Sequence, residues 1–154
     1  MTVYGVGIVG AGRVSRDHAF AVQTNSRLEF AGVADPEEHR RAAFSQRYGC
    51  PSFSDHRELF SRDDVDLVLL GAPHWLHATI GVEALKAGRH ILIEKPMAMT
   101  LEECDALVET AENSDVRLMV GHTQHFFAAN LTAQRSLRDS GACRTPTSGA
   151  SRSR

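Results

Sequence analysis

The 154-residue sequence has few cysteines, no long hydrophobic run and no excess of either charge. Its three cysteines are odd in number and widely spaced, which argues against a disulfide framework and a thiolate metal site. The longest apolar runs are far too short to cross a bilayer, and Met1–Gly5 lacks the pattern of a signal peptide. A formal charge of −2 gives no reason to expect nucleic acid or an anionic membrane as a partner. We therefore expect a cytoplasmic protein.

The composition, with 42% apolar and 23% charged residues, is that of a globular protein with one core. We expect this domain to cover residues 1–140. Residues 141–154 contain three arginines, no acidic residue and no large apolar residue. Such a segment cannot bury enough surface to become ordered, so we expect a disordered C-terminal tail.

The most informative stretch is Val6–Ser15, in which an apolar run breaks into two glycines and then into an amphipathic segment. This order predicts a strand, a turn and a helix. Gly10 permits the tight turn, and Gly12 has no Cβ to keep a diphosphate from the backbone. The unpaired N–H groups at the start of the helix favour an anion. Ser15 stands where a third glycine is usual and is small enough for close packing of the helix on the strand.

Asp35 ends the next strand-like segment, Leu28–Ala34, 20 residues beyond Ser15. At this spacing a carboxylate can accept hydrogen bonds from both hydroxyls of an adenosine ribose, and it would repel a 2′-phosphate. This predicts NAD in preference to NADP. Asp35 is also followed by proline and two glutamates, a pattern that would start a helix with Asp35 as its N-cap whatever the ligand. Arg40 and Arg41 on that helix could meet a 2′-phosphate, so NADP stays possible.

Strand-like and helix-like segments alternate along the rest of the chain. The further strands expected are Pro51–Phe53, Val65–Leu70, His90–Glu94 and Val116–Gly121. The further helices expected are His56–Phe60, Leu76–Ala87, a helix that begins with a capping box at Thr100–Glu103, and Phe127–Asp139. This alternation predicts an α/β fold with a doubly wound parallel sheet of about six strands, the Rossmann fold. Ligands of such sheets bind beyond the carboxyl ends of the strands.

Four motifs in this order resemble the glucose-fructose oxidoreductase, inositol dehydrogenase and MocA family. They are Gly10–Gly12, Ala34–Pro36, Ala72–Ala78 and above all Glu94–Ala98, and the resemblance extends over about Val3–Gly141. It implies an NAD(P)-dependent dehydrogenase that acts on a small hydroxyl-bearing substrate, such as a sugar, a polyol or a dihydrodiol. Gly121–Phe126 is more similar to the dihydrodiol dehydrogenase branch than to the sugar branch.

The resemblance implies that Lys95 is the catalytic residue, placed between the nicotinamide and the substrate. This agrees with the chemistry, because hydride leaves the carbinol carbon while a base removes the hydroxyl proton. Glu94 would position Lys95, and Pro96 would fix the turn through a cis peptide bond. The residues expected to contact the cofactor are Gly10, Ala11, Gly12, Arg13, Val14, Asp35, Ala72, Pro73, His77, Glu94 and Lys95.

Two pairs of histidines, His74 with His77 and His122 with His125, lie three residues apart at expected strand ends. We expect no metal there, because no cysteine or carboxylate completes a ligand set at a suitable spacing. Trp75, in the same loop as His77, is interpreted as a packing residue.

The resembling family builds its substrate pocket on a second domain, which we expect to be absent from these 154 residues. Two functions therefore stay open. The chain is either the nucleotide half of an oxidoreductase, with Lys95 competent but no complete substrate wall, or a non-catalytic NAD(P)-binding or interaction module. In the second case it could form a homo-oligomer through exposed apolar surface. A methyltransferase is disfavoured, because Asp35 and Glu94–Pro96 fit a dinucleotide better.

Overall fold

A computed structural model describes residues 2–140 of the chain. The chain divides into two compact units at Gly121 and His122. The second unit contains a short 3-10 helix, η2 (Thr123–Phe126), and one α-helix, α6 (Ala128–Asp139). The tail expected to be disordered, residues 141–154, lies outside the described residues.

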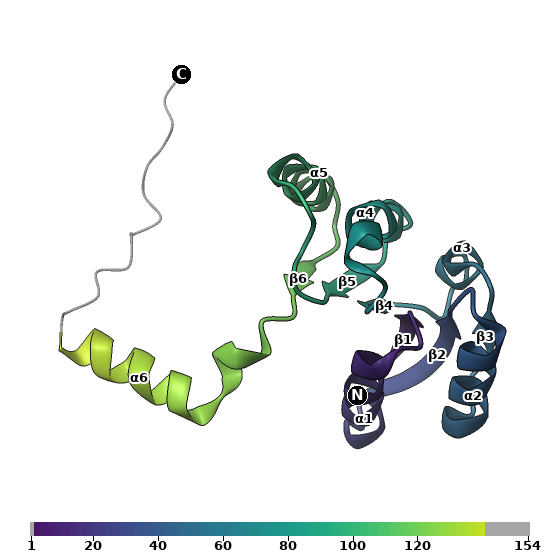
Figure 1. Ribbon diagram of the computed structural model, residues 1–154, viewed down its shortest axis with the longest axis horizontal. Helices are drawn as coiled ribbons and strands as arrows, with labels where there is room; N and C mark the ends of the chain where they lie inside the picture. Colours follow the sequence, from purple (N-terminus) through teal and green to yellow (C-terminus); the bar gives the residue numbers. More distant parts are fainter. Residues whose placement is uncertain (1, 141–154) are drawn as a thin grey trace. The chain divides into compact units, whose positions relative to one another are not determined.

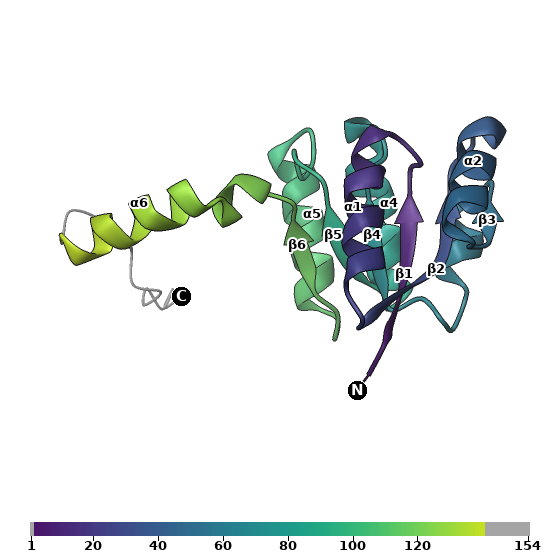
Figure 2. The same cartoon turned by 90° about the horizontal axis from the view of Figure 1, so that it is seen from below.

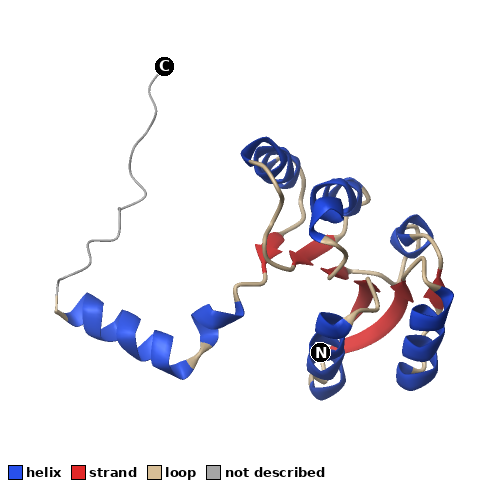
Figure 3. Cartoon of the chain, viewed as in Figure 1, coloured by secondary structure: helices blue, strands red, loops and turns tan. Residues whose placement is uncertain are grey.

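The first unit is a parallel sheet with helices on both faces (Figures 1 and 3). Its strands are β1 (Tyr4–Val9), β2 (Leu28–Ala34), β3 (Ser52–Phe53), β4 (Leu67–Leu70), β5 (His90–Ile93) and β6 (Leu118–Val120). All five pairings are parallel, in the order β3-β2-β1-β4-β5-β6. The strand order reverses between β1 and β4, and this is the point of a doubly wound sheet where ligands bind. The predicted fold class is confirmed.

The helices form two layers. α1 (Arg13–Thr24) and α2 (Glu38–Tyr48) cover one face of the sheet, and Figure 2 shows them side by side in front of the strands. α3 (His56–Phe60), α4 (His77–Lys86) and α5 (Leu101–Glu112) cover the other face, with the 3-10 turn η1 (His74–Leu76) leading into α4 (Figure 1). Half of the predicted capping box of α5 is confirmed, since the Thr100 hydroxyl accepts a hydrogen bond from Glu103 N–H at 3.2 Å. The Glu103 carboxylate accepts from Met99 N–H at 2.8 Å, one residue before the N-cap.

The core has two parts because the central strands are apolar on both faces. Val6 and Ile8 of β1 pack with α1 and α2, whereas Val9 packs with α3, α4 and α5. The same alternation divides Val68 and Leu70 of β4 from Leu69. Side chains of successive residues in a strand point to opposite faces, so a strand buried on both sides needs a continuous apolar run.

Two expectations about element boundaries are wrong. Asp35 is not the N-cap of α2, which begins at Glu38 after an N-cap residue, Glu37, that makes no side-chain cap. Val65 and Asp66 precede β4 instead of belonging to it. The Asp66 carboxylate accepts from Gly5 N–H at 2.8 Å and Arg89 donates to the Val65 carbonyl at 2.8 Å. Main-chain pairing nevertheless continues at Asp66, whose N–H donates to the Gly5 carbonyl oxygen at 2.8 Å and whose carbonyl oxygen accepts from His90 N–H at 3.0 Å.

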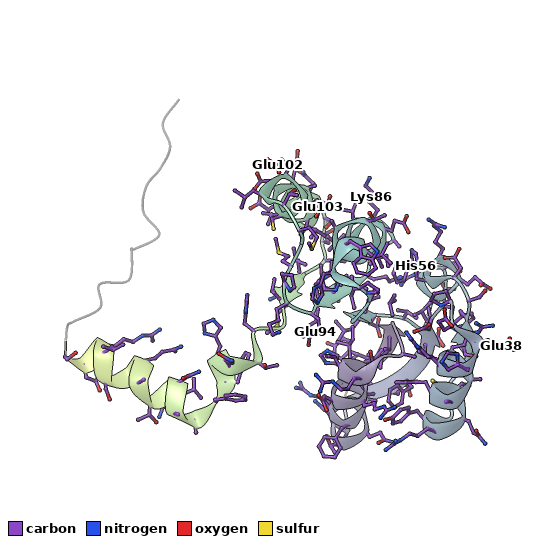
Figure 4. All side chains as sticks on the ribbon, in the orientation of Figure 1. Glu38, His56, Lys86, Glu94, Glu102 and Glu103 are labelled. Atoms are coloured by element: carbon purple, nitrogen blue, oxygen red, sulfur yellow. The ribbon has the colours of Figure 1, made fainter. Side chains whose placement is uncertain are left out.

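A polar cluster joins α3 to α4. Glu83 Oε2 lies 2.6 Å from His56 Nε2, and Glu83 Oε1 accepts from Arg57 at 3.1 Å; Figure 4 labels His56, the first residue of α3. Burial is the largest single effect on Glu83 and raises its pKa, but the hydrogen bonds and charges of His56 and Arg57 together lower the pKa below its ordinary value of 4.5. The ionised carboxylate is thus favoured by folding.

We expect Glu83→Gln to destabilise the protein at pH 7 and less so in acid. A carboxyl with a lowered folded-state pKa stabilises the protein above its unfolded-state pKa, and this contribution is lost as pH falls through the folded-state pKa. Because the pair is partly exposed, the loss at pH 7 should be about 0.5 kcal/mol. Thermal unfolding at pH 7 and at pH 3 measures it. Glu109→Gln, on the exposed side of α5, is the control, and a Glu83→Gln defect that grows in acid would contradict the assignment.

Candidate functional site

The glycine turn after β1 has the geometry of an anion site. Gly10 has φ +90°, and a Cβ there would lie 2.8 Å from the Gly71 carbonyl oxygen, so only glycine fits. A Cβ built on Gly12 meets no atom within 4 Å. Helix α1 has no side-chain cap and no acidic residue in its first turn. Its first N–H groups and the positive end of its dipole are therefore left for a ligand.

Ser15 is fully buried under this turn. Its hydroxyl donates a hydrogen bond to the Gly10 carbonyl oxygen, and a Cβ on Gly71 would lie 3.1 Å from the Ser15 hydroxyl. The expectation that a small residue here lets α1 pack closely is confirmed.

Asp35 joins the end of β2 to the glycine turn. Its Oδ2 accepts from Ala11 N–H at 2.7 Å, its Oδ1 accepts from Glu37 N–H at 2.8 Å, and the residue is only 5% exposed. Each carboxylate oxygen can accept more than one hydrogen bond, so these contacts leave capacity for a ribose hydroxyl. The spacing from the glycine turn thus placed this carboxylate correctly, although its local role as a helix cap is wrong.

A basic hollow of about 680 Å³ adjoins the same turn between α1 and α2. Among the described residues that line it, none is acidic, and four are arginines: Arg13, Arg16, Arg40 and Arg47. Arg41 is engaged elsewhere, because it donates to the Pro36 carbonyl oxygen at 3.0 Å. The hollow therefore has a positive potential suited to phosphate groups.

The end of β5 carries Glu94 and Lys95. Glu94 lies between this strand and α1 (Figure 4), is 13% exposed, and accepts from Lys95 N–H at 3.3 Å through Oε2. The Lys95–Pro96 peptide bond is cis, as expected. Lys95 is exposed, and within residues 2–140 its side-chain amine has no protein partner. The amine is therefore available to a ligand at the carboxyl edge of the sheet.

His77, which we expect to contact the cofactor, has its side chain inside the fold. His77 is fully buried, with Nδ1 2.8 Å from the Pro96 carbonyl oxygen and Nε2 2.9 Å from the Ala72 carbonyl oxygen. It joins the loop after β4 to the loop after β5. The interpretation of Trp75 as a packing residue is wrong, because within the described part of the chain its side chain is 68% exposed.

His18 of α1 is a residue of this site that the sequence did not reveal. Its Nε2 lies 3.0 Å from Glu94 Oε1. The only signal was that a titratable side chain occupies a position of α1 with the spacing of its apolar face.

Within residues 2–140, no three histidine, cysteine, aspartate or glutamate side chains lie together in a way that could hold a metal ion. None of the helices there is long and apolar enough to cross a membrane.

A parallel sheet with a glycine turn at its switch point, a carboxylate after β2 and an anion site on α1 defines an NAD(P)-binding Rossmann domain. The chain belongs to the GFO_IDH_MocA family, described as an oxidoreductase family with an NAD-binding Rossmann fold, whose model matches residues 4–122.

Two relatives show how much of a longer protein the chain corresponds to. It is 33% identical over 123 residues to glucose-6-phosphate 3-dehydrogenase of Bacillus subtilis, covering 80% of this chain and 35% of the relative. It is 32% identical over 134 residues to trans-1,2-dihydrobenzene-1,2-diol dehydrogenase of Danio rerio, covering 85% of this chain and 40% of the relative. The chain thus spans less than half the length of either.

Solved structures show the same arrangement. The WlbA dehydrogenase from Chromobacterium violaceum in complex with NADH and UDP-GlcNAcA has a TM-score of 0.87 at 26% identity, over 90% of this chain and 41% of that chain. KijD10, a 3-ketoreductase from Actinomadura kijaniata in complex with NADP, has a TM-score of 0.81 at 26% identity, over 91% of this chain and 43% of that chain. Structures similar to this one therefore hold both forms of the cofactor.

We expect Gly10→Ala to reduce the stability of the fold and Gly12→Ala to weaken ligand binding. Gly10→Ala places a side chain at φ +90° and against the Gly71 carbonyl, at a cost of about 2 kcal/mol or more, or roughly 5 °C in Tm. Gly12→Ala has no protein atom to strike and should change Tm little, but its methyl group occupies the approach to the α1 N-terminus and should weaken NADH binding at least about tenfold, a cost of about 1.4 kcal/mol. Thermal unfolding and calorimetric titration measure the two effects. Unchanged NADH affinity in Gly12→Ala would show that the diphosphate does not bind at the N-terminus of α1.

Proposed function

We propose that the chain is the dinucleotide-binding part of an NAD(P)-dependent oxidoreductase that transfers hydride between nicotinamide and a hydroxyl-bearing small molecule. One observation supports this most: the glycine turn, Asp35 and Lys95 follow β1, β2 and β5 at the same edge of the sheet. From β2 to β5 there are three strand spacings, about 14 Å in all. This span suits an extended ligand with its ribose at Asp35, its diphosphate on α1 and its nicotinamide at Lys95.

The proposed chemistry at Lys95 follows from its exposed amine. A bound nicotinamide ring supplies the acceptor for the hydride. Lys95 Nζ takes up the hydroxyl proton as the carbinol becomes a carbonyl, and returns it in the reverse direction. In its protonated form Lys95 also stabilises negative charge on the substrate oxygen. Glu94 fixes the start of the loop through its hydrogen bond from Lys95 N–H.

The names of the relatives favour a ring that carries hydroxyl groups as the substrate. Glucose-6-phosphate 3-dehydrogenase and trans-1,2-dihydrobenzene-1,2-diol dehydrogenase both name such compounds.

We place the protein in the cytoplasm. A second copy of the chain is a further candidate partner, because large apolar side chains such as Met119 on the edge strand β6 are exposed.

Calorimetry with NADH and NADPH tests the adenosine end. Asp35→Ala should weaken NADH at least about tenfold, or about 1.4 kcal/mol, because the carboxylate no longer meets the ribose. Arg40→Ala is the matched variant and should weaken NADPH while leaving NADH within about twofold, which is less than about 0.5 kcal/mol. Failure of the folded wild-type chain to bind either dinucleotide would refute the proposed cofactor site.

Turnover tests the role of Lys95. The chain is incubated with NAD⁺ and either glucose 6-phosphate or trans-1,2-dihydrobenzene-1,2-diol, and absorbance of NADH is followed. We expect Lys95→Ala to abolish turnover and to weaken NADH about tenfold, or about 1.4 kcal/mol, because the nicotinamide end loses its contact with the amine. Lys95→Arg keeps the positive charge but removes the proton acceptor, so it should also be inactive. Binding without turnover by the wild-type chain would favour the non-catalytic module.

A further inference from the structure

His18 and Glu94 meet at the carboxyl edge of the sheet from elements that are not adjacent in it. His18 belongs to α1, which follows β1, and Glu94 follows β5, two strands away. His18 Nε2 and Glu94 Oε1 are 3.0 Å apart, and the two side chains are only 15% and 13% exposed. Burying a carboxylate is costly unless its oxygens have partners, so this contact needs an explanation beyond packing.

The Glu94 carboxylate is held on three sides. His18 faces Oε1, Lys95 N–H donates to Oε2 at 3.3 Å, and Gly121 lies so close that a Cβ there would be 3.2 Å from Oε1. Gly121 is itself fixed, because its N–H donates to the Ile93 carbonyl oxygen at 2.8 Å. The carboxylate therefore has little room to move while these contacts last.

The imidazole of His18 is close to Glu94 without making an aligned hydrogen bond to it. Nε2 is buried and, among the described residues, has no hydrogen-bond partner with good geometry. A buried polar nitrogen of this kind is rare in folded proteins and calls for a role. His18 Nε2 can therefore still form a hydrogen bond, and it lies beside Glu94 Oε1.

The position of His18 along α1 links this contact to the anion site. His18 is five residues beyond Arg13, the first residue of α1, which is about 7.5 Å along the helix axis. One rigid helix therefore joins the N–H groups that would hold the diphosphate to the carboxylate that holds the Lys95 loop.

We propose that His18 is a positioning residue for Lys95. It fixes the Glu94 carboxylate, and Glu94 fixes the main chain from which the Lys95 side chain leaves β5. Because His18 is on α1, it also sets the distance between the diphosphate and the amine. This inference rests on the proposed function, since it requires a dinucleotide with its nicotinamide end at Lys95.

Comparing NADH with ADP-ribose, which lacks the nicotinamide, tests this role in the 154-residue chain. His18→Ala should weaken NADH about tenfold and change ADP-ribose less than about twofold. His18→Gln, whose side-chain amide can donate to Glu94, should restore NADH affinity to within about threefold of the wild type. Adding Glu94→Gln to His18→Ala should cause no further loss, because both act through one contact. Phe20→Ala, exposed on the same helix, is the control, and thermal unfolding shows that each variant is folded.

Each other outcome overturns the role or its foundation. If the wild-type chain binds neither ligand, the proposed function fails. If the wild type binds both and His18→Ala binds NADH equally well, the function stands and the positioning role is wrong. Equal losses of NADH and ADP-ribose, or a Tm loss that His18→Gln does not rescue, would make His18 a structural residue of α1.

Discussion

The pairing of β1 with β2 on one side and with β4 on the other is the constraint on which the rest of this structure depends. Because β1 is the strand where the order reverses, the chain winds outward in both directions from it. Helices α1 and α2 therefore cover one face, and α3, α4 and α5 cover the other. The two layers diverge at the carboxyl end of β1. Here the first turn of α1 has no side-chain cap. Its N–H groups are therefore left to bind a ligand, and this is what makes the carboxyl end of β1 a binding site.

The loops around this point are fixed by polar side chains that bind main-chain groups of neighbouring loops. The buried polar residues of the described chain are Ser15, Asp35 and His77, and all three lie at the carboxyl edge. Ser15 binds the Gly10 carbonyl, Asp35 binds Ala11 N–H, and His77 lies between two carbonyl oxygens. Burying polar groups is costly unless they are bonded. These polar side chains are buried where loops without regular structure must keep a fixed shape, and their hydrogen bonds to the main chain hold that shape.

The same distinction explains what the sequence could predict. Apolar runs and breakers located the strands, and strands buried on both faces leave few alternatives to a doubly wound sheet. The distance from Ser15 to Asp35 also placed the carboxylate at the glycine turn. The N-cap role of Asp35 was wrong because α2 begins only at Glu38. The Asp35 carboxylate does accept the local hydrogen bond from Glu37 N–H, and its other oxygen binds Ala11 N–H, 24 residues away, which a local rule does not take into account. Burial of His77 depends on the pairing of β4 with β5, which brings Pro96 to it. Periodicity assigns a side chain to a face of a helix but does not identify its partner.

The adenosine end shows how rigidity decides between opposing charges. Asp35 and the arginines of the basic hollow act in opposite directions on a 2′-phosphate, one repelling and the others attracting. The Asp35 carboxylate is buried and held by two N–H groups, so it cannot move away from a phosphate. Arg40 and Arg13 are surface side chains of the hollow, and they must lose conformational freedom to hold one. Because the repulsion from Asp35 is fixed and the arginines must be ordered before they attract, we expect the ribose without a 2′-phosphate to bind better. The arginines should reduce the loss of affinity that the 2′-phosphate causes. The preference for NAD that we propose thus depends on the bonding of Asp35 to the glycine turn as much as on its charge.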